Sequence, residues 1–248
     1  MTSLEILNLN KSFGALAVSR DISLSIGADQ CHALIGPNGA GKTTLIHQIS
    51  GVLQPNSGSI KLEGHEISHM SVSQRVQAGL GRTFQITSVL PSFTVLENMA
   101  IAAQAKSGSS MRFFKDASRE TALNDTALST LDRVGLSGRG DSLAADLSHG
   151  ELRLLELGIA LAASPRFLLL DEPMAGLGRT ESAALIALLS ELRGDLPMLL
   201  VEHDMDAIFQ LADTVSVLVD GKIISRGTPD AVRSDPAARA AYLGDLTQ

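Results

Sequence analysis

The chain has 248 residues, of which 44% are hydrophobic, 19% charged and 3% aromatic, and it carries a formal net charge of −7 at pH 7. This length allows one large or two small domains with a sizeable core. The acidic balance, the scarcity of aromatic rings and the lack of a Lys/Arg run argue against a nucleic-acid surface, so no nucleic-acid partner is predicted.

The single cysteine, Cys31, excludes an internal disulfide and suits a reducing compartment. Its place in an apolar run predicts an inert buried thiol. No stretch approaches the ~20 apolar residues that span a bilayer. Residues 1–10 also lack the basic and apolar regions of a signal peptide. We therefore expect any role at a membrane to be exerted through a partner.

Two alternating apolar segments open the chain, Leu4 to Leu9 and Ile22 to Ile26, with a turn at Phe13-Gly14 between them. Alternation of this kind predicts half-buried strands. We expect a small antiparallel sheet ahead of a nucleotide-binding core.

A continuous apolar run, Cys31 to Ile35, predicts a buried strand that leads into Gly36-Pro37-Asn38-Gly39-Ala40-Gly41-Lys42-Thr43-Thr44. This segment matches the phosphate-binding loop, G-x-x-x-x-G-K-[ST]. Its glycines let backbone N–H groups curl toward phosphate oxygens. Lys42 would contact the β/γ-phosphates of ATP, and the Thr43 hydroxyl would ligate Mg²⁺.

An amphipathic helix is predicted directly after the loop, with its positive end toward the phosphates. Its apolar face is expected to comprise Leu45, Ile46, Ile49, Val52 and Leu53.

The middle of the chain changes character. Turn residues at Pro55 to Gly58 and the apolar Ile60-Lys61-Leu62 predict a hairpin-like piece. From about Ser88 to Ala163 the pattern is mostly helical, with one helix over Thr121 to Val134. Met111 to Lys115 is apolar and basic, which fits a loop packed on the helices or a contact with a partner or membrane surface.

The last third alternates strands and helices. Apolar runs at Phe167 to Leu170, Met198 to Val201 and Val215 to Val219 predict strands, and helices are predicted over Glu181 to Leu192 and Asp204 to Leu211. Continuous apolar strands that alternate with helices predict a parallel sheet covered on both faces.

Asp171-Glu172 follows a predicted strand directly, where open α/β sheets place their ligands. One carboxylate there can reach Mg²⁺ and the next can orient an attacking water. The alternative is that the two acids cap the following segment, with Pro173 ending the strand.

Ser148 and Glu151 form an S-x-x-E capping box ahead of an apolar helix. The exposed start of that helix could in addition bind a phosphate through its N–H groups and the Ser148 hydroxyl. Taken singly, Gln85 is better explained as a solvated loop residue and His203 as a hydrogen-bonded structural histidine.

Together, the phosphate loop, Gln85, Ser148 to Glu151, Asp171-Glu172 and His203 occur in the order typical of ABC-transporter ATPase subunits. The resemblance covers essentially the whole chain. It is strongest to the ATPases of branched-chain amino-acid and related amide or urea importers. The stretches that carry this likeness are Gly81-Arg82-Thr83-Phe84-Gln85, Thr94-Val95-Leu96-Glu97-Asn98, Val201-Glu202-His203-Asp204-Met205 and Ala241-Tyr242-Leu243-Gly244.

The resemblance implies a single α/β ABC ATPase domain with a RecA-like P-loop NTPase core, an N-terminal antiparallel β-subdomain and an inserted helical subdomain. The core and the β-subdomain would occupy residues 1–87 and 164–248. The helical subdomain would occupy residues 88–163.

The resemblance also implies a role for each motif residue. Phe13 would stack on the adenine of ATP, and Lys42 and the loop amides would hold its phosphates. Thr43, Gln85 and Asp171 would surround Mg²⁺.

Catalysis would fall to Glu172, as general base or water positioner, and to His203, as a sensor of the γ-phosphate. Ser148 and Gly150 would contact ATP bound to a second ATPase subunit, so that two subunits enclose two nucleotides.

Three positions depart from the pattern of many relatives. Phe13 stands in place of Tyr, which keeps stacking but loses the hydroxyl. His149 replaces Gly, which puts a residue with restricted φ in that turn. Gly178 replaces Asp, which puts the usual contact of this loop across the dimer in doubt.

We therefore expect a subunit that hydrolyses ATP to drive amino-acid import through a separate permease, with a solute-binding protein in the complex. It would lie on the cytoplasmic face of the inner membrane. Residues 86–98, with apolar Val89, Leu90 and Phe93, are the expected permease contact unless they pack inside the subdomain.

Two other functions remain open, an envelope-lipid exporter ATPase and a soluble ABC ATPase acting on DNA or ribosomes. The single cassette and the acidic charge disfavour the second. Amino-acid importers of this kind commonly pair two different ATPases, so the resemblance favours a heterodimer over a homodimer. Gly178 adds a modest hint, because a partner could supply the missing carboxylate.

Overall fold

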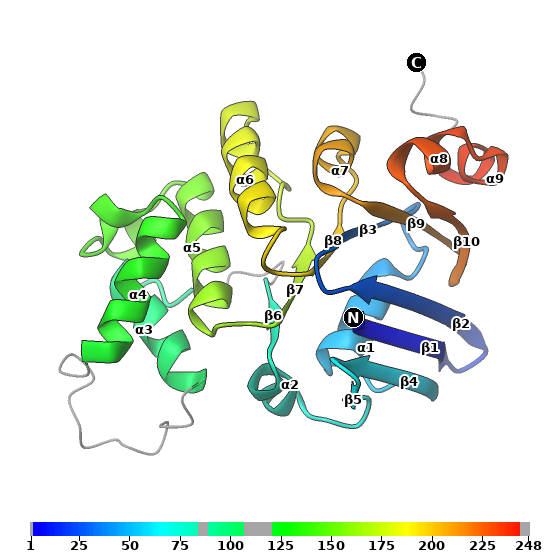
Figure 1. Cartoon of the computed structure of the whole chain (residues 1–248), viewed down its shortest axis with the longest axis horizontal. Helices are drawn as coiled ribbons and strands as arrows, with labels where there is room; N and C mark the ends of the chain where they lie inside the picture. Colours follow the sequence, from blue (N-terminus) through cyan, green and yellow to red (C-terminus); the bar gives the residue numbers. More distant parts are fainter. Residues whose placement is uncertain (1, 84–88, 107–120, 244–248) are drawn as a thin grey trace.

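The computed structural model describes residues 2–83, 89–106 and 121–243. Two sheets and several surrounding helices make up the fold (Figure 1). An antiparallel sheet has the strand order β2-β1-β4-β5, and a larger mixed sheet has the order β10-β9-β3-β8-β7-β6. The strands are β1 (Thr2–Phe13), β2 (Leu16–Gly27), β3 (Cys31–Ile35), β4 (Ser57–Leu62), β5 (His65–Glu66), β6 (Leu80–Arg82), β7 (Phe167–Asp171), β8 (Met198–Val201), β9 (Thr214–Val219) and β10 (Lys222–Gly227).

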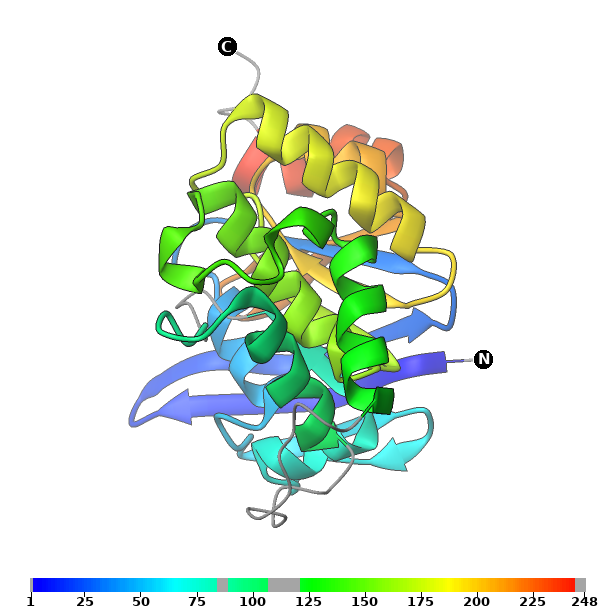
Figure 2. The same cartoon turned by 90° about the vertical axis from the view of Figure 1, so that its left-hand side faces the viewer.

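The helices lie on both faces of the mixed sheet and in a separate group on one side of it (Figures 1 and 2). They are α1 (Lys42–Ser50), α2 (Val72–Ala78), α3 (Val95–Lys106), α4 (Thr121–Arg133), α5 (His149–Ala162), α6 (Arg179–Leu192), α7 (Met205–Leu211), α8 (Pro229–Ser234) and α9 (Pro236–Ala238).

Helix α1 lies between the two sheets. Its apolar residues Leu45, Ile46 and Ile49 are fully buried in one cluster with Ile6 of β1 and Leu34 of β3. That cluster joins the inner face of the antiparallel sheet to the mixed sheet, so α1 is held on two sides. The residue that begins α1, Lys42, is therefore positioned by both sheets.

The parallel strands of the mixed sheet determine where the candidate site lies. Strand β3 pairs in parallel with β8 and β9, and β7 pairs in parallel with β8 and β6. Their carboxyl ends consequently meet at one edge of the sheet. The segments that leave this edge begin at Gly36 after β3, Glu172 after β7 and Glu202 after β8.

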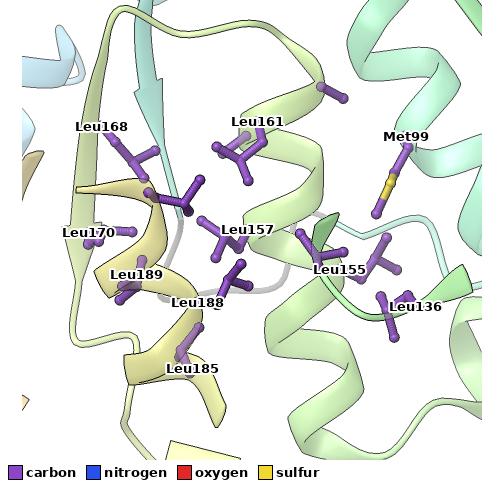
Figure 3. Close-up of a cluster of buried hydrophobic side chains, with 14 of the residues drawn as sticks. Met99, Leu136, Leu155, Leu157, Leu161, Leu168, Leu170, Leu185, Leu188 and Leu189 are labelled. Carbon is purple, nitrogen blue, oxygen red and sulfur yellow. The ribbon is translucent and has the colours of Figure 1, made fainter. Parts of the chain in front are cut away.

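Helix α5 links the helical group to the mixed sheet. Figure 3 shows Leu155, Leu157 and Leu161 of α5 between two sets of side chains. One set comes from α3 and the residues after α4, and the other from β7 and α6. The labelled side chains of these sets are Met99, Leu136, Leu168, Leu170, Leu185, Leu188 and Leu189. This packing fixes the start of α5, which carries Ser148.

The structure confirms the N-terminal antiparallel strands, the strands that begin at Cys31, Phe167 and Met198, and the helices of the last third. Their ends differ from the predicted ones by at most six residues, and the largest difference is at the start of β2. It corrects the extent of α1, which ends at Ser50. Gly51 follows in a left-handed conformation (φ 83°), and Val52 is 55% exposed instead of lying on the buried face. The apolar spacing continues past Gly51 to Val52 and Leu53, but this glycine ends the helix.

Strand β6, helix α2 and the helices after β10 were not predicted from the sequence. Strand β6 is a three-residue segment without periodicity, and it pairs with β7. Helix α2 had a readable start, since Ser71 and Gln74 form a capping box.

Candidate nucleotide-binding and hydrolysis site

The phosphate loop connects β3 to α1 through glycines that no other residue could replace without strain. A Cβ on Gly36 would lie 2.0 Å from the Leu218 carbonyl oxygen, and one on Gly41 would lie 2.8 Å from that of Val18. Gly39 has a φ of 81° and Gly41 one of 106°. The backbone therefore curls tightly over the end of the sheet, as a phosphate-binding loop requires.

The N-terminus of α1 is left open. Its N-cap is Gly41, which supplies no side-chain hydrogen bond, so the first N–H groups of the helix have no side-chain cap. These groups and the positive end of the helix dipole form an anion-binding arrangement. The Thr43 side chain is exposed beside them.

Lys42 is folded back onto the loop. Its Nζ donates to the Gly36 and Pro37 carbonyl oxygens at 2.6 and 3.0 Å. Burial lowers the pKa of Lys42, and the charges of Glu172 and Asp171 oppose that shift. The ammonium is thus incompletely solvated and held by neutral acceptors, which phosphate oxygens can replace with charge-assisted bonds.

Asp171 ends β7 with its side chain almost fully buried. Its Oδ2 lies 3.4 Å from Nη2 of Arg82, whereas its Oδ1 has no hydrogen-bond partner in the part of the chain that the structure describes. Burial raises the pKa of Asp171, against the opposing charge of Arg82. An orphaned carboxylate oxygen of this kind fits a Mg²⁺ ion or its bound water.

The described residues contain no group of three or more His, Cys, Asp or Glu side chains that could hold a metal. This suits Mg²⁺ at a nucleotide, because the ion takes few protein ligands and completes its shell with phosphates and water. Gln85, the other expected ligand, lies outside the described residues, as do Met111 to Lys115.

Glu172 has an unusual backbone. Its φ is 49°, a left-handed value that is costly for a residue with a Cβ. Its N–H donates to the Val201 carbonyl oxygen at 2.8 Å, which anchors it to the end of β8. The side chain is half-buried. Strained conformations of this kind are concentrated at functional sites.

His203 leaves the adjacent strand end, since Asp171 and Val201 are register partners in β7 and β8. Its side chain is 63% exposed, and its Nδ1 lies 3.8 Å from Oε2 of Glu202. The structure therefore brings the phosphate loop, Asp171, Glu172 and His203 to one edge of the mixed sheet.

Phe13 lies at the end of β1, paired with Leu16 at the tip of the β1–β2 hairpin. Its ring is 51% exposed, with Lys11 Nζ 5.4 Å from the ring centroid. Strand β2 also carries Val18, whose carbonyl lies against Gly41. An exposed ring on this hairpin is suited to stacking on a base.

Ser148 and Gly150 occupy a different element, the start of α5. Ser148 Oγ accepts from the Glu151 N–H and Glu151 Oε2 from the Ser148 N–H, which confirms the capping box. His149 is the first residue of α5 and does not have a positive φ, so the expected strain at this departure is absent. Ser148 is exposed, whereas a Cβ on Gly150 would lie 2.5 Å from Glu181 Oε1.

Two functional neighbours were missed from the sequence. Arg82 bridges Ser50 Oγ (2.8 Å) and Asp171, which ties the end of α1 to β7. Glu202 accepts backbone N–H groups from two segments. For Glu202 the available signal was a charged residue directly after a buried strand. Arg82 ends β6, a strand that was not predicted, so the sequence offered no such signal for it.

A protein-family model described as ABC transporter matches residues 19–175, more than half of the chain. The chain belongs to the ABC transporter ATPase family. A second model, described as branched-chain amino acid ATP-binding cassette transporter, matches residues 222–245.

Relatives match over nearly the full length. The chain is 34% identical to the high-affinity branched-chain amino acid transport ATP-binding protein LivG of Escherichia coli K12, with 98% of each chain covered. It is 32% identical to the lipopolysaccharide export system ATP-binding protein LptB of Haemophilus influenzae, with 99% of this chain and 98% of the relative covered.

The fold agrees with a crystal structure of the ADP conformation of an ATP-binding cassette of an ABC transporter. The TM-score is 0.87 at 31% identity, covering 98% of this chain and 99% of that chain. The RecA-like core with its antiparallel subdomain is thereby confirmed. The protein is an ATP-binding, ATP-hydrolysing subunit of an ABC transporter.

Proposed function

We propose that this ATPase energises the import of branched-chain amino acids, or of related amino acids and amides, through a separate permease. The observation that supports this substrate class is the match of residues 222–245 to the branched-chain amino-acid model, together with the full-length likeness to LivG. The likeness to LptB keeps envelope-lipid export as the second candidate.

The site residues divide the chemistry among them. Lys42 and the amides of the phosphate loop bind the phosphates of ATP, Phe13 stacks on its base, and Thr43, Asp171 and Gln85 hold Mg²⁺. When bound, the ion neutralises charge on the phosphates. The roles of the loop, Thr43 and Asp171 rest on the open start of α1, the exposed Thr43 and the orphaned Asp171 oxygen. The role of Phe13 rests on its exposed ring, and that of Gln85 on the family resemblance alone.

Glu172 accepts the proton of the attacking water, because its carboxylate stands beside Lys42 at the strand edge and its backbone is fixed by Val201. His203 contacts the γ-phosphate from the neighbouring strand end. The exposed Ser148 and the adjacent Gly150 act on the nucleotide of a second ATPase subunit.

We infer that the second subunit is a different chain. Gly178 precedes α6 and offers only its N–H, which donates to Glu181 Oε2 at 3.0 Å. A partner that carries a carboxylate at this position would restore one contact across the dimer. Sedimentation of purified Glu172→Gln with ATP checks this inference: a mostly monomeric chain supports it, and a tight homodimer contradicts it.

We propose residues 86–98, together with an apolar cavity that α3 also lines, as the permease contact. Within the described part of this segment, Leu90 and Phe93 are about two-fifths exposed, whereas Val89 is buried and belongs to the core instead. The apolar cavity, of about 180 Å³, lies between α2, β6 and α5, and it is also lined by Ala102 of α3, the helix that begins at Val95. We propose that a permease helix packs on this surface, at the junction of the helical subdomain (88–163) and the core.

Phe93→Asp should uncouple uptake from ATP hydrolysis while the chain stays folded. Leu128→Asp is the matched control, because Leu128 is similarly exposed on α4. Loss of soluble folded protein in the Phe93 variant would instead show that this side chain packs in the core.

The direct test of function uses the membrane complex. Purification of the tagged chain from detergent-solubilised inner membranes should yield a permease, a second ATPase subunit and a solute-binding protein. Cells that carry Glu172→Gln should then lose uptake of labelled leucine. If leucine uptake is unchanged and lipopolysaccharide transfer is defective, the proposed function is wrong and lipid export takes its place. We propose that the chain lies at the cytoplasmic face of that membrane, held there by the permease.

No helix among residues 2–83, 89–106 and 121–243 has the length and apolar character of a membrane span.

A further inference from the structure

Glu202 is a buried carboxylate that joins the two strand ends of the hydrolytic site. Its side chain is 0% exposed and follows the last residue of β8. Oε1 accepts the N–H of Met174 at 2.8 Å, from the segment after β7. Oε2 accepts the N–H groups of His203 at 3.0 Å and Asp204 at 3.4 Å.

Burial of a charge is unfavourable unless hydrogen bonds or an opposite charge compensate for it. In the described part of the chain, the only group within ion-pair distance of Glu202 is His203, with Nδ1 at 3.8 Å. The compensation therefore comes mainly from three backbone N–H groups. A side chain that served only to fill space would not require a carboxylate here.

These bonds act on the backbone of the residues assigned to chemistry. Glu172 has a strained φ of 49° and is anchored at its own N–H by Val201. Met174, two residues later, is anchored by Glu202. The strained residue is thus held on both sides by the end of β8, and the same carboxylate fixes the backbone of His203.

We propose that Glu202 is a positioning residue for ATP hydrolysis, which holds the Glu172 and His203 segments in register so that both reach the same nucleotide. The inference rests on the roles proposed above for Glu172 and His203. It assigns no contact between Glu202 and ATP.

The test substitution is Glu202→Gln. The amide has nearly the same shape, but one of its two ends becomes an NH₂ donor. That end must face either the Met174 N–H or the His203 and Asp204 N–H groups, so one anchor is lost. A misplacement of about 1 Å lowers enzymatic rates by about 10²-fold.

The assay uses the full chain with its partner subunit and measures ATP hydrolysis, ATP affinity and amide hydrogen exchange. In Glu202→Gln, kcat should fall at least about tenfold while KM for ATP changes less than about threefold. Exchange should rise in peptides covering residues 172–178 and 203–205.

Asp213→Asn is the matched control. Asp213 Oδ2 accepts the Cys31 N–H at 2.9 Å, so this change also converts a carboxylate that anchors a neighbouring strand into an amide. Asp213 directly precedes β9, so it lies at the amino ends of the parallel strands, whereas Glu202 follows the carboxyl end of β8. Its kcat and its exchange in residues 172–178 should stay at the parental level.

A Glu202→Gln rate within about twofold of the parental rate overturns the proposal, as does a parallel loss of rate and ATP affinity. Should the amide variant fail to fold, Glu202→Asp, which is one methylene too short to span both anchors, should show the same loss of kcat. A parental rate in Glu172→Gln would instead refute the role of Glu172, and that failure is separate.

Discussion

The two ends of α1 are built in opposite ways. At the N-terminus, Gly41 caps nothing and Lys42 turns back onto its own loop. At the C-terminus, the fully buried Arg75 donates to the carbonyl oxygens of Gln48 and Ile49, both at 2.6 Å, and also to those of Ser68 and Met70. Within the described residues, the first end has no side-chain cap, whereas at the other end the carbonyl oxygens of His47, Gln48 and Ile49 accept hydrogen bonds.

The difference separates function from stability within a single helix. Orphan N–H groups are unfavourable unless a ligand, water or side chain binds them, so the open end is available for phosphates. Orphan carbonyls at the other end are satisfied by a cation that also matches the negative end of the helix dipole. We expect substitutions at the two ends to affect different measurements.

The largest effect is expected where the open end meets chemistry. Glu172→Gln retains the side-chain shape but cannot accept a proton, so hydrolysis should fall by about 10²- to 10⁴-fold. ATP affinity should be unchanged, and the ATP-bound dimer should persist. A parental rate of phosphate release, measured on the purified complex, would contradict the assignment.

The closed end should govern stability instead. Arg75→Met removes a buried cation and leaves several carbonyls unpaired, so the free energy of unfolding should fall by about 3–5 kcal/mol. Chemical denaturation measures this change. Arg166→Met is the control, because the ion pair of Arg166 with Glu63 is exposed and should contribute less than about 1 kcal/mol. A loss below 1 kcal/mol for Arg75→Met would mean that water satisfies these carbonyls.

The open end of α1 could be predicted from the sequence, whereas the Arg75 contacts at its other end could not. Gly36 to Thr44 is a contiguous motif whose chemistry is local, and Asp171 and His203 followed recognisable buried strands. Arg75 lies in α2, a short helix that was not predicted, and its four carbonyl acceptors come from two places in the chain. No pattern in one sequence shows such a convergence.

The same limit applies to Glu202 and to Glu172. The bridge from Glu202 to Met174 depends on the pairing of β7 with β8, and the positive φ of Glu172 depends on its anchor to Val201. The helix limit at Ser50, by contrast, was readable from Gly51. The roles of individual site residues and the division at residues 88–163 stay predictions.

Lowering the pH should destabilise the mixed sheet that packs against α1. This effect should not distinguish between the two ends of the helix. His32 lies on the face of β3 that also carries Leu34, and its Nε2 is 2.9 Å from Ser216 Oγ. Burial lowers the pKa of His32 from 6.5 to about 3. The unfolded chain therefore binds a proton below pH 6.5 that the folded chain does not, and stability falls as pH falls through this window.

Between pH 7.5 and 5, the free energy of unfolding should decrease by about 2 kcal/mol through His32. Urea denaturation at the two pH values measures the change. His32→Asn should make the pH dependence shallower, and an unchanged slope would show that His32 does not titrate as stated.

The smallest expected effect is a difference between two glycines, Gly39 in the phosphate loop ahead of α1 and Gly51 directly after α1. Gly39 and Gly51 have nearly the same φ, 81° and 83°, so alanine introduces similar backbone strain of about 1 kcal/mol at both. A Cβ at Gly39 meets nothing within 4 Å, whereas one at Gly51 lies 2.8 Å from Arg75 Nε. Gly51→Ala should therefore be more destabilising by about 1 kcal/mol in thermal unfolding. Equal losses would show that Arg75 shifts freely.

Calorimetric titration of ATP with Mg²⁺ into the parental chain, Lys42→Ala and Arg75→Lys tests the separation most directly. Lys42→Ala should weaken ATP binding about 10- to 100-fold, because charge-assisted bonds to phosphate are lost, while stability changes by less than about 1 kcal/mol. Arg75→Lys should keep parental affinity but unfold more easily. Parental ATP affinity in Lys42→Ala would contradict the account that the open end of α1 is the phosphate site.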